Sequence, residues 1–212
     1  MRETLLDSPK ARIIRICCGP FESLCYLVED KIDKRAFLID AGCPAGEVVE
    51  LVEERDLKLE AILITHAHFD HVLEVNAIAK ATVSKPIAHS SDVQMLPVYW
   101  KESLGEIPQI LPLAEEGLLL SLKSFSFEVL HTPGHTPGSV CYYSRDLGVI
   151  FTGDTLFKGA VGTLAYSYDP EGYKKMRKSL KKLSTLPGET RVFPGHGEAT
   201  TIEEEKGMMR NF

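Results

Sequence analysis

The stretch T-H-A-H-F-D-H, residues 65–71, places four side chains that can bind a metal ion within six positions. They are His66, His68, Asp70 and His71. Alternate residues of an extended backbone project to the same side, so His66 and His68 can converge on one ion. Asp70 and His71 can face a second point close by once the chain turns. Imidazole and carboxylate ligands suit zinc, iron or manganese, whereas calcium prefers oxygen ligands alone. The stretch therefore predicts a metal site.

The residues in front of this stretch predict where it lies. Residues 61–64 are wholly apolar, as in a strand buried on both faces, and ligand sites gather at the carboxyl ends of such strands in layered α/β folds. We expect strands at 12–17, 23–29, 36–40, 61–64, 85–88, 118–122, 125–130, 140–144, 148–152 and 191–194. We expect helices at 46–56, 70–80, 90–100, 173–183 and 201–210, and a surface loop at 101–117. Two sheets packed face to face, with helices outside, satisfy this order in a single domain, residues 1–212.

Three further motifs end strands with residues of the same chemistry. T-P-G-H-T-P-G-S holds His135 in a rigid turn, and F-T-G-D-T puts Asp154 just past an apolar strand. P-G-H-G brackets His196 with glycines, which allow close approach of the backbone. Together with the first stretch, these strand-end residues indicate one metal centre.

The seven residues and the motifs around them resemble the metallo-β-lactamase superfamily. THAHFDH, HTPGHTPGS, FTGDTLF and FPGHG are similar to motifs of its glyoxalase II branch, the hydroxyacylglutathione hydrolases, from about residue 12 to the end. The resemblance implies an α/β fold, the four-layer αβ/βα sandwich of the metallo-β-lactamase type, with metals at one edge between the sheets. It implies two divalent ions, which we expect to be zinc, with iron or manganese as alternatives. His66, His68 and His135 would hold one ion, Asp70, His71 and His196 the other, and Asp154 would bridge them.

The resemblance also implies hydrolysis of a thioester of the hydroxyacylglutathione type. Two ions about 3.5–4 Å apart can share a hydroxide and polarise the substrate carbonyl. A zinc-bound water has a pKa of about 7 and is a ready nucleophile at neutral pH. The metal charge would stabilise the tetrahedral oxyanion while a thiolate departs. Asp70 would orient the metal-bound hydroxide by accepting its hydrogen bond.

The residues expected to bind substrate depart from that branch. Longer glyoxalase II enzymes continue with a helical domain that helps to grip glutathione, and we expect no such domain in the sixteen residues that follow His196. They also carry a basic residue after GDTLF that holds a glutathione carboxylate, and Thr163 stands at that position. Lys158 and Tyr166 are the candidates to take over this contact with the substrate.

Two other activities of the same fold stay open. Persulfide dioxygenases are oxidoreductases that hold a single iron with the equivalents of His66, His135 and Asp154. They typically carry a Gly-Cys-Gly-Arg-Thr-Asp stretch after GDTLF, which this sequence lacks. A lactonase or other small-ester hydrolase also fits, because metal ligands alone do not choose the acyl substrate. A non-catalytic binding module is disfavoured, because all seven ligand positions are filled.

The composition predicts a cytoplasmic protein, and the resemblance implies a small-molecule thioester or ester as its substrate. A formal net charge of −6 over 212 residues disfavours nucleic acid as a partner. No segment approaches the ~20 apolar residues of a membrane span. The five cysteines have no C-x-x-C spacing, and His89 and His131 are expected to lie outside the ligand set. The oligomeric state stays open. One dense basic cluster is expected to be a solvated helix face: Lys174, Lys175, Arg177, Lys178, Lys181 and Lys182.

Overall fold

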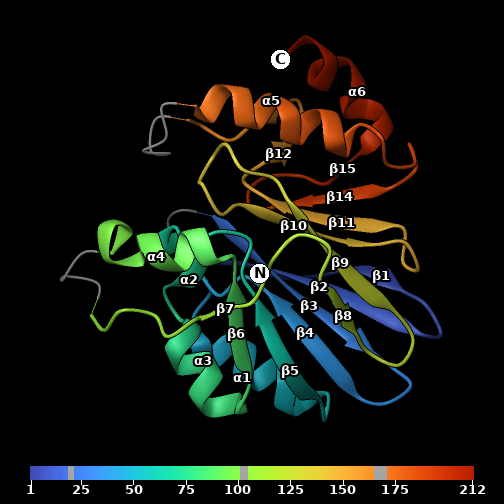
Figure 1. The fold of residues 1–212 in the computed structure, drawn as a ribbon. Coiled ribbons are helices and arrows are strands. Elements are labelled where there is room, and N and C mark those ends of the chain that lie inside the picture. Colours follow the sequence, from blue (N-terminus) through green and yellow to red (C-terminus); the bar gives the residue numbers. More distant parts are fainter. Residues whose placement is uncertain (19–21, 101–104, 165–170) are drawn as a thin grey trace.

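The computed structural model covers residues 1–212, and the structure is described for residues 1–18, 22–100, 105–164 and 171–212. Two sheets pack face to face, with helices on both outer sides (Figure 1). The first sheet contains, in spatial order, β1 (Arg2–Asp7), β2 (Ala11–Cys18), β3 (Ser23–Asp30), β4 (Arg35–Ile39), β5 (Lys58–Leu63), β6 (Lys85–Ala88) and β7 (Leu111–Pro112). The second contains β15 (Thr200–Thr201), β14 (Arg191–Pro194), β11 (Val149–Gly153), β10 (Val140–Ser144), β9 (Ser126–His131) and β8 (Leu119–Ser121).

Short hairpin strands and six helices complete the described fold. The hairpin pairs β12 (Leu156–Phe157) with β13 (Ala160–Val161). The helices are α1 (Ala45–Glu54), α2 (Phe69–Val72), α3 (Val75–Thr82), α4 (Ser90–Tyr99), α5 (Gly172–Leu183) and α6 (Ile202–Asn211).

The four layers follow from the alternation of side chains along the strands. On β2, Ile14 and Ile16 pack in the cluster that contains Val48 of α1, whereas Ile13 points into the core between the sheets. On the far side, Ile150 of β11 packs in a cluster with Leu180 of α5 and other residues of α5 and α6. The order is therefore helices, sheet, sheet, helices, which confirms the predicted αβ/βα sandwich.

Parallel neighbours bring the ends of key strands to one edge of the sandwich. β5 lies between β4 and β6 and is parallel to both. In the second sheet β11 is parallel to β14, so the segments after Gly153 and Pro194 leave the sheet at the same end. The antiparallel pair β9–β10 adds the turn that holds residues 132–139.

Three expectations about the elements need correction. The first strand, β1, was not expected, because its sequence RETLLD has no clear alternation and a bulge interrupts its pairing with β2. The helix expected at 70–80 is two helices, α2 and α3. Ala41 donates a hydrogen bond to the carbonyl of His71 and accepts one from the amide of Glu74, so the helical ladder cannot run through. The segment expected as a loop at 101–117 contains β7, and residues 101–104 lie outside the described part.

Candidate metal centre

The predicted ligands converge between the two sheets at the edge where β5, β11 and β14 end. His66 and His68 follow β5, Asp70 and His71 lie in α2, and His135 stands in the turn between β9 and β10. Asp154 and His196 follow β11 and β14. The structure thus brings together all seven residues, which come from four segments of the chain.

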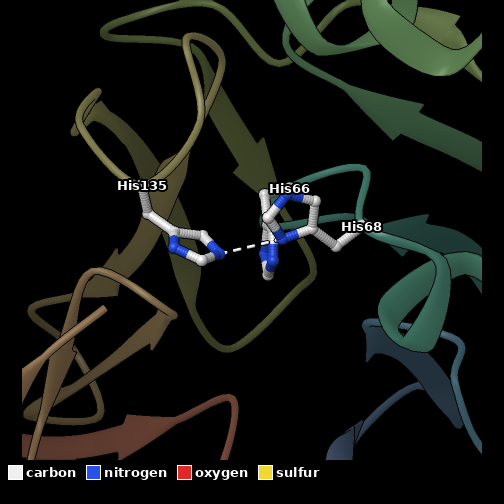
Figure 2. Close-up of side chains that lie close together, drawn as sticks. All are labelled: His66, His68 and His135. Carbon is white, nitrogen blue, oxygen red and sulfur yellow. Dashed lines mark hydrogen bonds between the residues drawn. The ribbon is translucent and has the colours of Figure 1, made fainter. Parts of the chain in front are cut away.

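The first group consists of three imidazoles. The ligand atoms of His66, His68 and His135 all lie within 4.8 Å of one another. His68 Nδ1 and His135 Nε2 are 2.9 Å apart. Figure 2 shows the rings pointing toward one another, with His135 approaching from the loop opposite His66 and His68. Three converging ring nitrogens suit one transition-metal ion.

The second group combines one carboxylate with two imidazoles. Asp70 Oδ2 lies 3.2 Å from His196 Nε2 and 3.5 Å from His71 Nε2. The two ring nitrogens are 3.3 Å apart. As in the first group, the ligand atoms of these three residues all lie within 4.8 Å of one another.

Asp154 lies between the two groups. Its Oδ1 is 3.5 Å from His71 Nε2, and its Oδ2 is 3.6 Å from His135 Nε2 and 3.8 Å from His196 Nε2. His66, His71 and Asp154 also form a cluster of their own. The carboxylate is therefore placed to contact ions in both groups.

Asp40 orients His71 of the second group, and no local motif in the sequence predicts this role. Its Oδ2 lies 2.9 Å from His71 Nδ1, and the amide and hydroxyl of Thr65 both donate to its carboxylate. This leaves His71 Nε2 as the nitrogen that faces Asp70 and Asp154. The available signal was its position at the end of β4, a parallel neighbour of β5.

Asp92 of α4 joins the two ligand loops and was also missed. It is fully buried, and it accepts hydrogen bonds from the amide of Ala67 at 2.8 Å, the hydroxyl of Thr136 at 2.9 Å and the amide of Gly138 at 2.7 Å. Ala67 stands between His66 and His68, while Thr136 and Gly138 follow His135. No local motif marks Asp92, because its partners are 25 to 46 positions away.

Thr163 has a different role from the one its position suggested. His135 Nδ1 donates a hydrogen bond to the backbone carbonyl of Thr163 at 2.8 Å. This contact leaves Nε2 of His135 facing His68 and Asp154. The main chain at this position therefore orients a candidate ligand.

The electrostatics of the centre favour a bound cation. Burial lowers the pKa of His66 far below its usual range, and burial together with the neighbouring His135 lowers the pKa of His68 to about 3. Both imidazoles are therefore neutral, with a ring nitrogen lone pair that can bind a metal. Burial disfavours a charged His71, but Asp154 and Asp40 outweigh it and raise the pKa to about 10. Burial likewise opposes ionisation of Asp70, yet the hydrogen bond from His196 and the charge of His71 lower its pKa to about 2. A positive charge is thus stabilised among these carboxylates.

Two buried atoms of the centre fit metal ligation directly. His66 Nε2 and Asp154 Oδ1 have no hydrogen-bond partner among the described residues. Such atoms are costly to bury unless something else satisfies them. Gly195 lets the chain pass close by, because a Cβ there would lie 2.3 Å from Asp154 Oδ1 and 2.7 Å from His71 Cε1. The nitrogen and oxygen donors, their convergence and these two atoms all fit divalent metal ions.

The predicted substrate contacts and the remaining histidines lie elsewhere. Lys158 forms an ion pair with Glu198 at 2.6 Å, next to Phe157, whose ring centroid is 6.3 Å from that of His196. Tyr166 lies outside the described residues. His89 and His131 stack on each other with centroids 4.0 Å apart and belong to neither ligand group.

No helix in the described part of the chain is long and apolar enough to cross a membrane.

Comparison with known proteins assigns the chain to a family. The family model of the metallo-beta-lactamase superfamily matches residues 18–196. The hydroxyacylglutathione hydrolase GloC of Haemophilus influenzae is 36% identical over 197 residues, which are 88% of this chain and 91% of that protein.

Solved structures have the same fold. TTHA1623 in a di-iron-bound form superposes with a TM-score of 0.76 at 37% identity, covering 90% of this chain and 96% of that one. ETHE1 from Myxococcus xanthus superposes with a TM-score of 0.72 at 27% identity, covering 92% and 81%. The chain therefore belongs to the metallo-β-lactamase superfamily and is a metallo-hydrolase of that fold.

Proposed function

We propose that the chain hydrolyses a thioester of the hydroxyacylglutathione type with two divalent metal ions, most simply zinc. The observation that carries this proposal is the place of Asp154, whose two oxygens face ligands of both groups. In this proposal His66, His68 and His135 hold one ion and Asp70, His71 and His196 hold the other. The likeness to GloC supports the substrate class, and the di-iron form of TTHA1623 supports two ions while leaving the metal open.

The metal ions would supply Lewis acidity and an activated water nucleophile at neutral pH. The protein would supply the orientation. Asp40 and Thr163 hold the rings of His71 and His135 through their Nδ1 atoms. The side chain of Asp70 is 15% exposed, and it would accept a hydrogen bond from the attacking water. Because the nucleophile in this proposal is the metal-activated water, no side chain of the protein needs to act as a nucleophile.

For substrate binding we propose Lys158, and Tyr166 stays a prediction from the sequence. The ammonium of Lys158 is largely exposed and already pairs with the exposed carboxylate of Glu198. A substrate carboxylate could exchange with Glu198, because exposed ion pairs contribute only about 0–1 kcal/mol. The cytoplasmic location and the restriction to small molecules likewise stay predictions.

A persulfide dioxygenase with a single iron is the second candidate. The similarity to ETHE1 is compatible with it, and His66, His135 and Asp154 are all present at the centre. The two candidates differ in what they ask of Asp70, His71 and His196. A dinuclear hydrolase needs these residues as ligands, whereas a mononuclear enzyme keeps its metal without His196.

Metal analysis combined with activity separates these candidates. We expect two equivalents of metal and turnover of lactoylglutathione. His196→Ala should reduce this activity by more than about 100-fold, because even residues behind a ligand cost 10–100-fold. His131→Gln is the matched control and should stay active. It removes an imidazole outside both groups, and glutamine keeps a side-chain N–H for the carbonyl of Pro137, which His131 Nε2 contacts at 3.0 Å. One iron with oxygen uptake on glutathione persulfide would refute the proposal, and activity on a lactone or simple ester alone would refute its substrate.

A further inference from the structure

The outer helical layer contains a groove that the metal centre does not use. It lies between α5 and the C-terminal part of α6 and has a volume of about 680 Å³. In Figure 1 these two helices form the layer above β14 and β11, on the face away from the first sheet. Five cationic side chains line it: Lys174, Arg177, Lys178, Lys181 and Arg210.

The cations of α5 form one exposed row. Positions 174, 177, 178 and 181 are spaced by three and four residues, which places them on one face of the helix. At about 1.5 Å per residue the row extends over about 10 Å. The opposite face carries Met176, Leu180 and Leu183, which are buried against the second sheet. The sequence predicted a solvated helix face here, and these four side chains are exposed. Because α6 packs beside α5, this face also lines a groove between the two helices.

Most of this positive charge has no neutralising partner in the part of the chain that the structure describes. Among the described residues only Lys174 has an acidic partner within 4.0 Å, the exposed Glu171. The glutamates in the first turn of α6 do not line the groove. Glu203 pairs with Lys206, and Glu205 accepts from the amide of Gly159 and the hydroxyl of Thr200.

This unneutralised row costs stability when nothing is bound. Like charges three and four residues apart destabilise a helix by about 0.2–0.5 kcal/mol a pair. The helix dipole favours Lys181 near the C-terminus, but it does not explain Lys174 and Arg177 in the first half. A bound anion would remove this repulsion.

The groove also has an apolar part. Tyr173 is 54% exposed, and its ring is held by stacking on Phe212 at 5.0 Å and by a hydrogen bond from its hydroxyl to the carbonyl of Phe212. Met209 lies between the two helices and is buried. Aromatic and thioether groups contact planar apolar groups favourably.

We propose that this groove binds a small molecule that carries two or more neighbouring phosphates and a planar apolar group, such as a nucleoside triphosphate. Several cations within about 10 Å match adjacent phosphates, which arginine and lysine bind through charge-assisted hydrogen bonds. The volume falls in the range of small-ligand pockets, about 300–1,000 Å³. The acidic net charge of −6 disfavours a long polyanion such as nucleic acid.

Calorimetric titration of the metal-loaded protein with ATP and with inorganic tripolyphosphate tests the proposal. Arg177→Gln/Lys178→Gln should weaken ATP binding by at least about tenfold, because two charge-assisted contacts are lost. Lys10→Gln/Lys123→Gln removes the same charge from exposed positions for which the structure gives no ion pair among the described residues, and it should bind as wild type does. His196→Ala should also retain ATP binding, which separates this groove from phosphate bound at the metal centre.

The other outcomes are equally informative. No ATP binding, equal loss in both double variants, or loss only in His196→Ala would overturn the proposal. Capture by phosphatidylglycerol vesicles without competition by ATP would overturn it in favour of a membrane surface. ATP should bind more tightly than tripolyphosphate, and Tyr173→Ala should remove that difference. Equal affinity for both in the wild type would leave the phosphate site standing and refute the contact with the planar group.

Discussion

Replacing Asp92 by alanine tests how the two ligand loops are held together. Asp92 is fully buried, and its carboxylate accepts hydrogen bonds from Ala67, Thr136 and Gly138. Burial raises the pKa of Asp92, and these three donors act against that rise. Alanine removes an acceptor that reaches both loops, so His66, His68 and His135 lose a common support.

The magnitude follows from the number of donors left without an acceptor. A buried donor deprived of its partner costs about 1–3 kcal/mol. Three of them together cost about 3–9 kcal/mol, and release of the buried carboxylate returns part of its desolvation cost. We therefore expect Asp92→Ala to lower the free energy of unfolding by about 3–5 kcal/mol. Asp92→Asn keeps one oxygen and should lose less, about 1–3 kcal/mol.

Urea unfolding of the metal-depleted protein measures this effect without a contribution from lost metal. Asp146→Ala is the matched control, because Asp146 also accepts from a backbone amide, that of Ser126, but is exposed. The control should change the free energy of unfolding by less than about 0.5–1 kcal/mol. If Asp92→Ala unfolds within about 1 kcal/mol of wild type, Asp92 does not hold the loops.

Three further changes test the surroundings of the centre. Asp40→Asn should weaken metal binding in the group of Asp70, His71 and His196 by about 10–100-fold, measured by competition with a chromogenic chelator, and unchanged affinity would contradict the role of Asp40. Gly134→Ala should lower the free energy of unfolding by about 2–4 kcal/mol, because its Cβ would lie 2.7 Å from Met176 Cα at a φ of +150°. Gly46→Ala, in helix α1 with open space around it, should not lower the free energy of unfolding and should raise it by up to about 1 kcal/mol. Protein with free metal at 100 to 1,000 times Kd should be more stable by about 3–4 kcal/mol than protein stripped of metal by EDTA. An unchanged melting temperature after EDTA treatment would show that no metal is bound tightly.

The convergence of the seven candidate ligands could be predicted because its signals are local. The spacing from His66 to His71 and the Gly-rich turns around His135 and His196 lie within a few residues of each ligand. The layers could be predicted from the pattern of apolar residues along the strands. A strand such as β2 lies between two cores, with successive side chains packed into opposite ones, so its sequence is largely apolar.

The supporting contacts could not be predicted, because they join distant segments. Asp40 meets His71 across 31 positions, and Asp92 meets Gly138 across 46. The break between α2 and α3 depends on Ala41, whose backbone groups compete for those of His71 and Glu74. The groove between α5 and α6 likewise arises only when the two helices pack on the second sheet.

The most direct test of the central proposal is to locate the metal ions by anomalous diffraction from crystals of the metal-loaded protein. We expect two anomalous peaks, one among His66, His68 and His135 and one among Asp70, His71 and His196, with an oxygen of Asp154 next to each. The two peaks should be separated by about 3.5–4 Å, the spacing at which both ions can act on one substrate. A single peak among His66, His135 and Asp154, with His196 turned away, would contradict the dinuclear centre.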